Sequence, residues 1–352
     1  MRDENLGDSM TWLEHLFGEK RHQTNPSREI TSNFLLVSFS SFVAQGAYDE
    51  GFWNGVRFFL YDIGEDAGSV ATLNMYSWIP WIPKLLYAAC SDMIPICGYR
   101  RKWYIFLGSI VTGLSVGLAG LHGLTFNLQA IYMVIGCTAS AWANVAVDAL
   151  VVERSQDKDA LVAARLQAFV KTAYGTGMVL SDIVFGFAID WYHPRVTYYL
   201  FAFFQIVTAF FALVLDEKRV TPDRRDLNGS RISEAIVQVG DLETATVKRQ
   251  FLLVFQTLMN PRIFFPVTVL TTLLSMPVAS EALRIYFVEE LHFSASFLGV
   301  MDAACTICGG AGLIIWAGTI ADSGMRGVFV WTTVGVILCN LWLPPFVTGG
   351  KR

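Results

Sequence analysis

The segment Pro83–Phe106, PKLLYAACSDMIPICGYRRKWYIF, is the stretch that decides the fold. It is an apolar run interrupted by one acid, Asp92, and then by three consecutive bases, Arg100, Arg101 and Lys102. Apolar sequence resumes directly on both sides. A soluble core strand would not need these charges between two apolar runs, whereas a tight turn between two membrane-spanning helices would.

The composition of the whole chain agrees with a membrane protein. Of the 352 residues, 53% are hydrophobic and only 16% are charged, whereas ordinary soluble chains are about 25% charged. The net charge of −4 is small, and no basic tract is long enough to indicate a nucleic-acid partner. The first thirty residues are polar and charged, so we expect the first span to act as its own insertion signal.

Several apolar stretches reach the roughly 20 residues that a helix needs to cross a bilayer. The nine candidates are residues 33–60, 69–90, 103–122, 127–151, 167–189, 196–215, 263–285, 295–318 and 327–348. The chain is therefore predicted to be an all-α polytopic membrane protein. Its predicted parts are a cytosolic N-terminal tail (1–32), a six-helix half (33–215), a cytosolic central loop (216–262) and an incomplete second half (263–352).

Lysine and arginine set the orientation. They gather in the N-terminal tail, at Arg100–Lys102 and in the 216–262 loop, all of which share one side of the membrane. The positive-inside rule then places the N-terminus in the cytosol. The glycosylation sequon at Asn228 would face the cytosol and stay unmodified. The choice between plasma membrane and organelle membrane stays open.

The chain contains an internal repeat. Arg284–Glu289 echoes Arg57–Asp62, and the hinge from Asp322 to Arg326 echoes the one that begins at Asp92. Six spans, a long basic loop and a second copy of the same order form the plan of the major facilitator superfamily, whose halves are parallel repeats.

Three blocks carry a narrower resemblance: Pro80–Lys84 (PWIPK), Ser91–Arg101 (SDMIPICGYRR) and Asp148–Arg154 (DALVVER). They are similar to the patterns PW..K, SD..P..GYRR and DA...E of the folate–biopterin transporter family. The resemblance implies a major facilitator-type helical bundle that transports folate, biopterin or a related organic solute by alternating access coupled to protons. S-adenosylmethionine-like solutes lie within the same expectation.

The same resemblance implies twelve spans or so, and the ninth is the last one here. We therefore expect either a truncated product or a degenerate member with one complete six-helix half and about three helices of the second. The alternative function is a non-transporting half-transporter or interaction protein.

Charges inside spans are costly and are the first candidates for function. Lys84 follows Pro80 and Pro83 in the middle of a span. On the family reading it faces a central cavity and attracts an anionic group of the solute. The alternative is a structural ion pair of Lys84 with Asp49, Glu50 or Asp148.

Other charged residues extend this substrate and proton site. Asp49 and Glu50 are proton-carrier candidates, unless the first span ends near Ala47 and leaves both exposed. Lys171 and Asp182 are eleven residues apart and share one helix face, which lines either a substrate cavity or an interhelical contact.

The hinge residues are predicted to act in gating rather than in substrate binding. The alternative is simple anchoring of the bases at the anionic inner leaflet. The predicted gating set consists of Asp92, Arg100 and Arg101, of Asp148, Glu153 and Arg154 at the end of the fourth span, and of Asp322 and Arg326 in the second hinge.

Metal and enzyme chemistry find little support in the sequence. Cys305 and Cys308 have metal-site spacing, but no second pair or histidine cluster accompanies them. No nucleophile elbow or acid pair of an enzyme is evident. We expect no enzymatic activity, no cofactor and no metal, with a small organic solute and the lipid bilayer as partners and the oligomeric state open.

Overall fold

The computed structural model describes residues 30–156, 158–217 and 290–315, together with isolated positions between 219 and 288 and residue 334. The chain divides into two units, and the fold described below is that of the unit made of residues up to 218 and from 293 onwards. The predicted spans 263–285 and 327–348 and the central loop fall largely outside the described residues.

The described residues form helices joined by short turns. Four of the helices are long and apolar enough to cross a membrane, and a fifth is apolar but shorter. The four are α6 (Lys102–Ala119), α7 (Phe126–Ser155), α8 (Ala160–Trp191) and α13 (Ala295–Ile315), and the shorter one is α9 (Val196–Ala212). The prediction of an all-α polytopic membrane protein is confirmed.

The first predicted span is one continuous helical stretch with a local irregularity. Helix α2 (Ser32–Ala47) begins at the N-cap Thr31, whose hydroxyl oxygen accepts a hydrogen bond from the Phe34 N–H at 3.2 Å. It runs through a π-helical turn, η2 (Tyr48–Phe52), into α3 (Trp53–Asp62). The helix therefore does not end near Ala47, and Asp49 and Glu50 lie half-buried within it. Such π-helical turns often mark functional positions.

The second predicted span is broken in its middle. Helix α4 (Ala67–Trp78) is capped by Asp66, whose carboxylate accepts from the Ser69 N–H at 2.8 Å. A 3₁₀ turn, η3 (Ile79–Trp81), follows, and α5 (Lys84–Met93) starts afresh after Pro83. Proline lacks the backbone donor that a helix interior needs and restricts the residue before it. The break makes Lys84 the first residue of α5.

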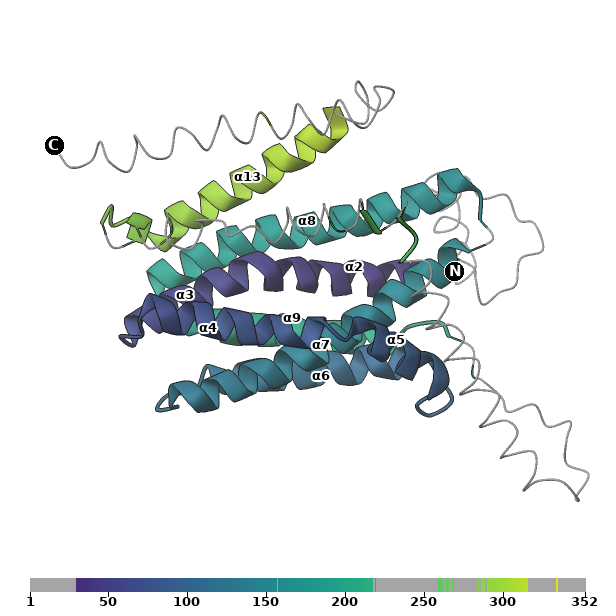
Figure 1. The fold of residues 1–352 in the computed structure, drawn as a ribbon, viewed down its shortest axis with the longest axis horizontal. Coiled ribbons are helices and arrows are strands. Elements are labelled where there is room, and N and C mark those ends of the chain that lie inside the picture. Colours follow the sequence, from purple (N-terminus) through teal and green to yellow (C-terminus); the bar gives the residue numbers. More distant parts are fainter. Residues whose placement is uncertain are drawn as a thin grey trace, which may run out of the picture. The chain divides into compact units, whose positions relative to one another are not determined.

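The remaining described helices follow the predicted stretches, with α7 and α8 longer than predicted toward the hinge. The extra turns contain charged residues. These lower the local hydropathy, so the predicted apolar stretches ended before them. Figure 1 shows the long helices running alongside one another. Helix α6 packs on α7 and α9, whereas α2 and α13 both pack on α8.

The α2–α8 contact depends on glycine. A β-carbon added at Gly177 would collide with the carbonyl oxygen of Val43, and one added at Gly46 would collide with that of Tyr174. The two backbones therefore touch directly, as small residues allow in membrane helix pairs. This close approach brings the π-helical turn of the first span against the middle of α8.

Two apolar clusters fill the bundle. The cluster at the hinge end includes Phe34 and Leu150, and the one at the far end includes Phe52 and Phe201, whose rings stack at 4.6 Å. Large apolar side chains such as Phe203 also point outward and are exposed. An apolar exterior is what a lipid-facing surface requires.

Candidate solute cavity and charged hinge

The hinge between α5 and α6 is a tight two-residue turn. Ile96 and Tyr99 exchange two backbone hydrogen bonds, at 2.9 and 3.0 Å, across Cys97 and Gly98. Both central residues have positive φ, 52° and 80°, which glycine adopts readily and cysteine rarely. The Tyr104 hydroxyl donates to the Ile94 carbonyl oxygen at 2.8 Å and holds the start of the turn. These bonds close the hinge as a tight turn between α5 and α6.

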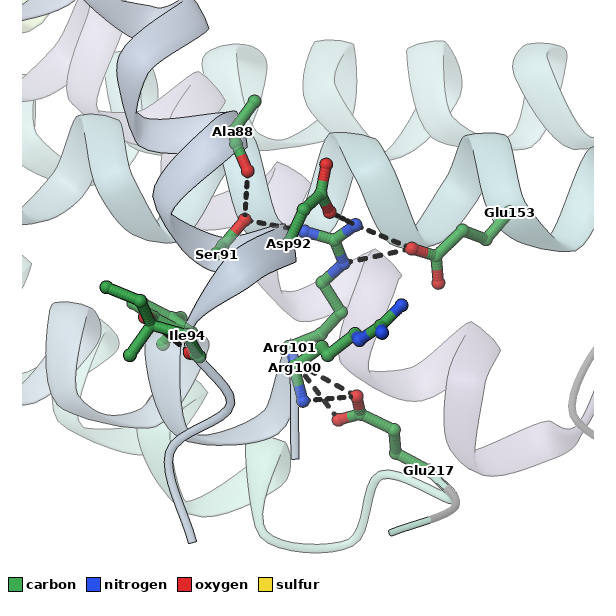
Figure 2. A network of polar contacts seen from close by, with 9 residues as sticks. Ala88, Ser91, Asp92, Ile94, Arg100, Arg101, Glu153 and Glu217 are labelled. Atoms are coloured by element: carbon green, nitrogen blue, oxygen red, sulfur yellow. Dashed lines mark hydrogen bonds and ion pairs between the residues drawn. The ribbon is translucent and has the colours of Figure 1, made fainter. Parts of the chain in front are cut away.

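Arg101 ties three helices together at this hinge (Figure 2). Its guanidinium donates to the Ser91 hydroxyl at 2.6 Å and to the Glu153 carboxylate at 2.6 and 3.1 Å, and it pairs with Asp92. Arg101 is only 3% exposed. Burial alone lowers the pKa of this guanidinium, but the Glu153 and Asp92 carboxylates outweigh burial and raise the pKa overall. Arg101 therefore stays charged inside the network.

A third acid, from a distant part of the chain, caps the same hinge. The Glu217 carboxylate accepts backbone N–H groups of Arg100 at 2.8 Å, Arg101 at 3.0 Å and Lys102 at 2.8 Å. These N–H groups lie at the N-terminus of α6, where helical partners are missing and a negative charge is favourable. The segment after α9 is thereby fastened to the start of α6.

Arg154 fastens this segment from the other side. It is buried, its guanidinium donates to the Asp216 carbonyl oxygen at 2.7 Å, and it lies 5.4 Å from the centre of the Phe34 ring. Asn33 in turn donates to the Asp216 carboxylate at 2.8 Å. The beginning of α2, the end of α7 and the end of α9 are thus joined beside the hinge.

The structure sorts the predicted gating residues into different places. Asp92, Arg101 and Glu153 form one network, whereas the Arg100 side chain is exposed and its backbone N–H alone joins the cap. Asp148 lies away from this network, in the cavity described next. The second-half equivalents, Asp322 and Arg326, lie outside the described residues.

A cavity of about 270 Å³ lies between the broken span, the π-helical turn, α7 and α8. It therefore opens where two of the described helical stretches depart from regular geometry. Its lining combines aromatic, amide and charged side chains: Phe42, Gln45, Asp49, Trp78, Trp81, Lys84, Asn144, Asp148, Val170, Lys171 and Tyr174.

Lys84 enters the cavity from the break before α5. Its ammonium donates to the Asn144 side-chain oxygen at 3.1 Å and lies 4.5 Å from the centre of the Trp81 ring, a cation–π distance. Among the described residues, its hydrogen bond is thus to an amide, and no ion pair joins it to Asp49, Glu50 or Asp148. An ammonium held this way keeps its charge available to an anionic group.

Asp49 is held firmly on the opposite wall. Its carboxylate accepts from the Tyr174 hydroxyl at 2.7 Å and from the Gln45 amide at 3.1 and 3.2 Å. Asp49 and Glu50 are both half-buried within the first span, although Glu50 is not among the residues that line the cavity. Of the two predicted proton carriers, Asp49 therefore lines the cavity and Glu50 does not.

Lys171 and Asp182 are also separated. The Lys171 ammonium lies 5.9 Å from the centre of the Tyr174 ring and lines the cavity. Asp182 is buried where α8 crosses α13, so closely that a β-carbon at Gly299 would collide with its carbonyl oxygen. Asp182 is not part of the cavity lining, and its role in substrate binding stays a prediction.

The described lining thus holds two carboxylates and two ammonium groups. Lys84 and Lys171 both act electrostatically on Asp148, which lies exposed to the cavity between α5 and α8. Four charged groups inside membrane spans are functional candidates by default, because burying them has a cost that packing alone does not recover. The described residues contain no group of three or more histidine, cysteine or acidic side chains that could hold a metal.

The comparison with protein families gives one match, which covers most of the chain. The BT1 family model matches residues 45–343. The chain belongs to the BT1 family. This BT1-family chain is 25% identical over 299 residues to the folate-biopterin transporter of Synechocystis. The matched region covers 84% of this chain and 57% of that relative.

Other relatives of this BT1-family chain carry similar names. It is 24% identical to probable folate-biopterin transporter 7 of Arabidopsis thaliana, over 85% of this chain and 63% of the relative. It is 25% identical to folate transporter 2 of Plasmodium falciparum, over 75% of this chain and 54% of the relative. The chain therefore spans a little more than half the length of the curated relatives it matches.

Sequence reasoning missed six polar or aromatic residues of the cavity in this BT1-family chain. Three of them have a simple signal, because each lies one helical turn from a charged residue that was singled out. Gln45 precedes Asp49 by four positions, Asn144 precedes Asp148 by four, and Tyr174 follows Lys171 by three. Of the other three, Trp78 and Trp81 lie on either side of Pro80 at the break, and Phe42 lies on α2. The capping role of Glu217 had no local signal.

Proposed function

We propose that this BT1-family chain is a secondary active transporter of folate, biopterin or a related organic solute and that the cavity is its solute site. The names of its relatives support the solute class. The observation that carries the proposal is the placement of Lys84 at a helix break, over an aromatic ring and inside a cavity. Secondary transporters bind their solutes near the middle of the membrane, at helices interrupted in this way.

The cavity chemistry matches a flat, partly anionic solute. Trp78 and Trp81 line the cavity and offer aromatic surface for contact with a heteroaromatic ring. Lys84 and Lys171 attract an anionic or electron-rich group of the same molecule. The volume of 270 Å³ is close to the lower limit of about 300 Å³ for small-molecule sites, which suits the ring portion of such a solute.

The hinge network serves as the gate in this proposal. With the N-terminus in the cytosol, the network of Asp92, Arg101 and Glu153 lies at the cytosolic end of the bundle. Alternating access then requires that these ion pairs form in one state and separate in the other, with the equivalent hinge at Asp322 and Arg326 in the second half.

Proton coupling is assigned to Asp49, with Glu50 beside it. A half-buried carboxylate within a span is the kind of group that carries protons in transporters. Protonation of Asp49 would change the hydrogen bonds that its carboxylate accepts from Tyr174 and Gln45. Both of these side chains line the same cavity. The solute site and the proton site would then share side chains.

The proposal is tested by uptake of labelled folate and labelled biopterin into cells that express the chain. Lys84→Ala should abolish saturable uptake. Lys158→Ala removes the same charge from a half-buried position outside the cavity, in the turn after α7, and should leave uptake within about twofold of the parent chain. Equal uptake by both variants would remove Lys84 from the site. Absence of saturable uptake by the parent chain would favour the alternative of a non-transporting interaction protein.

A further inference from the structure

The carboxylate of Asp148 differs from the other acid in the cavity. Asp49 already accepts hydrogen bonds from Tyr174 and Gln45. Asp148 also lines the cavity and is exposed to it, yet within the described part of the chain it receives no hydrogen bond and forms no close ion pair. An ionised carboxylate is an acceptor with two oxygens, and inside a membrane span its donors must come from water or from a ligand.

Two cations, Lys84 and Lys171, act on this acid electrostatically, but among the described residues neither donates a hydrogen bond to it. Lys84 donates to Asn144, which lies on α7 one turn before Asp148. Asn144, which binds the Lys84 ammonium, and Asp148 are about 6 Å apart along the axis of α7, the rise of four helical residues. That spacing is roughly the width of a fused bicyclic ring. A solute that fits must offer hydrogen-bond donors to Asp148 and acceptors or negative charge to Lys84.

The ring shared by folate and biopterin has this arrangement of groups. One edge of a 2-amino-4-oxopteridine carries two parallel donors, the 2-amino group and the adjacent ring N–H. A carboxylate accepts such a pair of donors in a two-bond arrangement, which is stronger and more directional than a single bond. The carbonyl oxygen and ring nitrogens elsewhere on the ring are acceptors and suit an ammonium.

We propose that Asp148 determines specificity by accepting the 2-amino and ring N–H donors of the pteridine, with the ring packed against the tryptophans and its acceptors toward Lys84. The inference rests on the proposed function, because it concerns how the same cavity chooses its solute. It assigns Asp148 to substrate recognition. The sequence had grouped Asp148 with the gating residues of the hinge, because it lies close to Glu153 and Arg154 in the chain.

The test compares two ligands that differ at this edge. Pterin carries the 2-amino group, and lumazine, the 2,4-dioxopteridine, has a carbonyl oxygen in its place. Each is titrated into the purified 352-residue chain in detergent, and binding is followed by quenching of tryptophan fluorescence. We expect the parent chain to bind pterin about 10- to 100-fold more tightly than lumazine, because a hydrogen-bonded charged group is involved and lumazine faces it with an oxygen.

Asp148→Asn should reduce the preference for pterin over lumazine to within about threefold. The variant should bind pterin more weakly and lumazine with the same affinity as the parent chain. Unchanged lumazine binding shows in the same experiment that the variant is folded. Asp148→Glu should restore part of the preference. Asp159→Asn, which neutralises an exposed acid at the start of α8, is the matched control and should keep the full preference.

Two outcomes separate this inference from the proposed function. If the parent chain binds both ligands with equal affinity, or if Asp148→Asn keeps the full preference for pterin, the role of Asp148 is refuted while the solute site stands. If the parent chain binds neither ligand, the proposed pteridine site itself fails and the inference fails with it.

Discussion

Replacing Arg101 by alanine should destabilise the folded chain far more than replacing its neighbour Arg100. The two residues are consecutive, carry the same charge and lie at the same end of the bundle. Only the Arg101 side chain enters the network with Ser91, Asp92 and Glu153, whereas that of Arg100 is exposed. The pair of variants therefore separates a structural network from simple attraction of bases to an anionic membrane surface.

The magnitude follows from the burial of the three charged groups. Removing one partner of a fully buried ion pair costs about 3–5 kcal/mol. The side chains of Asp92 and Glu153 are 55% and 44% exposed, so water rehydrates both carboxylates once Arg101 is gone. We reduce the expected loss accordingly to about 2 kcal/mol for Arg101→Ala. Arg100→Ala should change stability by less than about 0.5 kcal/mol, as for other exposed positions.

The assay is unfolding of the purified chain in one detergent, with both variants measured beside the parent. A double-mutant cycle with Glu153→Gln should give a coupling energy to Arg101 of about 1 kcal/mol, as found for residues that share one network. Equal losses for Arg100→Ala and Arg101→Ala, or a coupling energy of zero, would show that the bases act only through their net charge. The network would then not hold the hinge.

Three further perturbations have defined outcomes. Gly177→Ala should destabilise the α2–α8 contact by about 1–3 kcal/mol, because its β-carbon would collide with the Val43 carbonyl oxygen. Gly175→Ala on the same helix meets no described atom within 4 Å and should be neutral or stabilising in the same unfolding assay, and equal losses would contradict the close crossing. Glu217→Ala removes the acceptor of three backbone N–H groups and should lower stability by about 1–2 kcal/mol, whereas an unchanged stability would show that the cap is dispensable. Asp49→Asn should abolish uptake driven by a pH gradient in proteoliposomes but retain exchange of labelled for unlabelled solute, and pH-driven uptake at the parent rate would remove Asp49 from proton coupling.

Much of this architecture follows from the sequence because membrane helices obey simple rules. Every backbone polar group must be paired within lipid, so long apolar stretches become helices, and proline marks where one of them breaks. The break before Lys84 and the tight turn at Gly98 are local consequences of local residues, and both are visible in the sequence.

The contacts that build the cavity and the hinge depend instead on tertiary packing. Asp148 and Glu153 are close in sequence, yet they lie more than one helical turn apart and serve different places, the cavity and the hinge. Glu217 reaches the start of α6 across more than a hundred residues. No local pattern encodes such a contact, because it depends on how α9 packs against α6.

The π-helical turn in the first span also escapes sequence rules. Tyr48–Phe52 has no proline, and its two consecutive acids, Asp49 and Glu50, do not by themselves encode a π-helical turn. Its position coincides with the close approach of α2 to α8, where Gly46 lies against Tyr174. The turn brings Asp49 to the Tyr174 hydroxyl. Hydropathy and charge spacing do not predict this hydrogen bond.

The most direct test of the solute site is an experimental structure of the chain with biopterin bound. The account predicts the pteridine ring inside the cavity, packed against Trp81, with Asp148 at its donor edge and Lys84 at its acceptors. A pteridine found outside the cavity lined by Lys84, Asp148 and Lys171 would contradict the account.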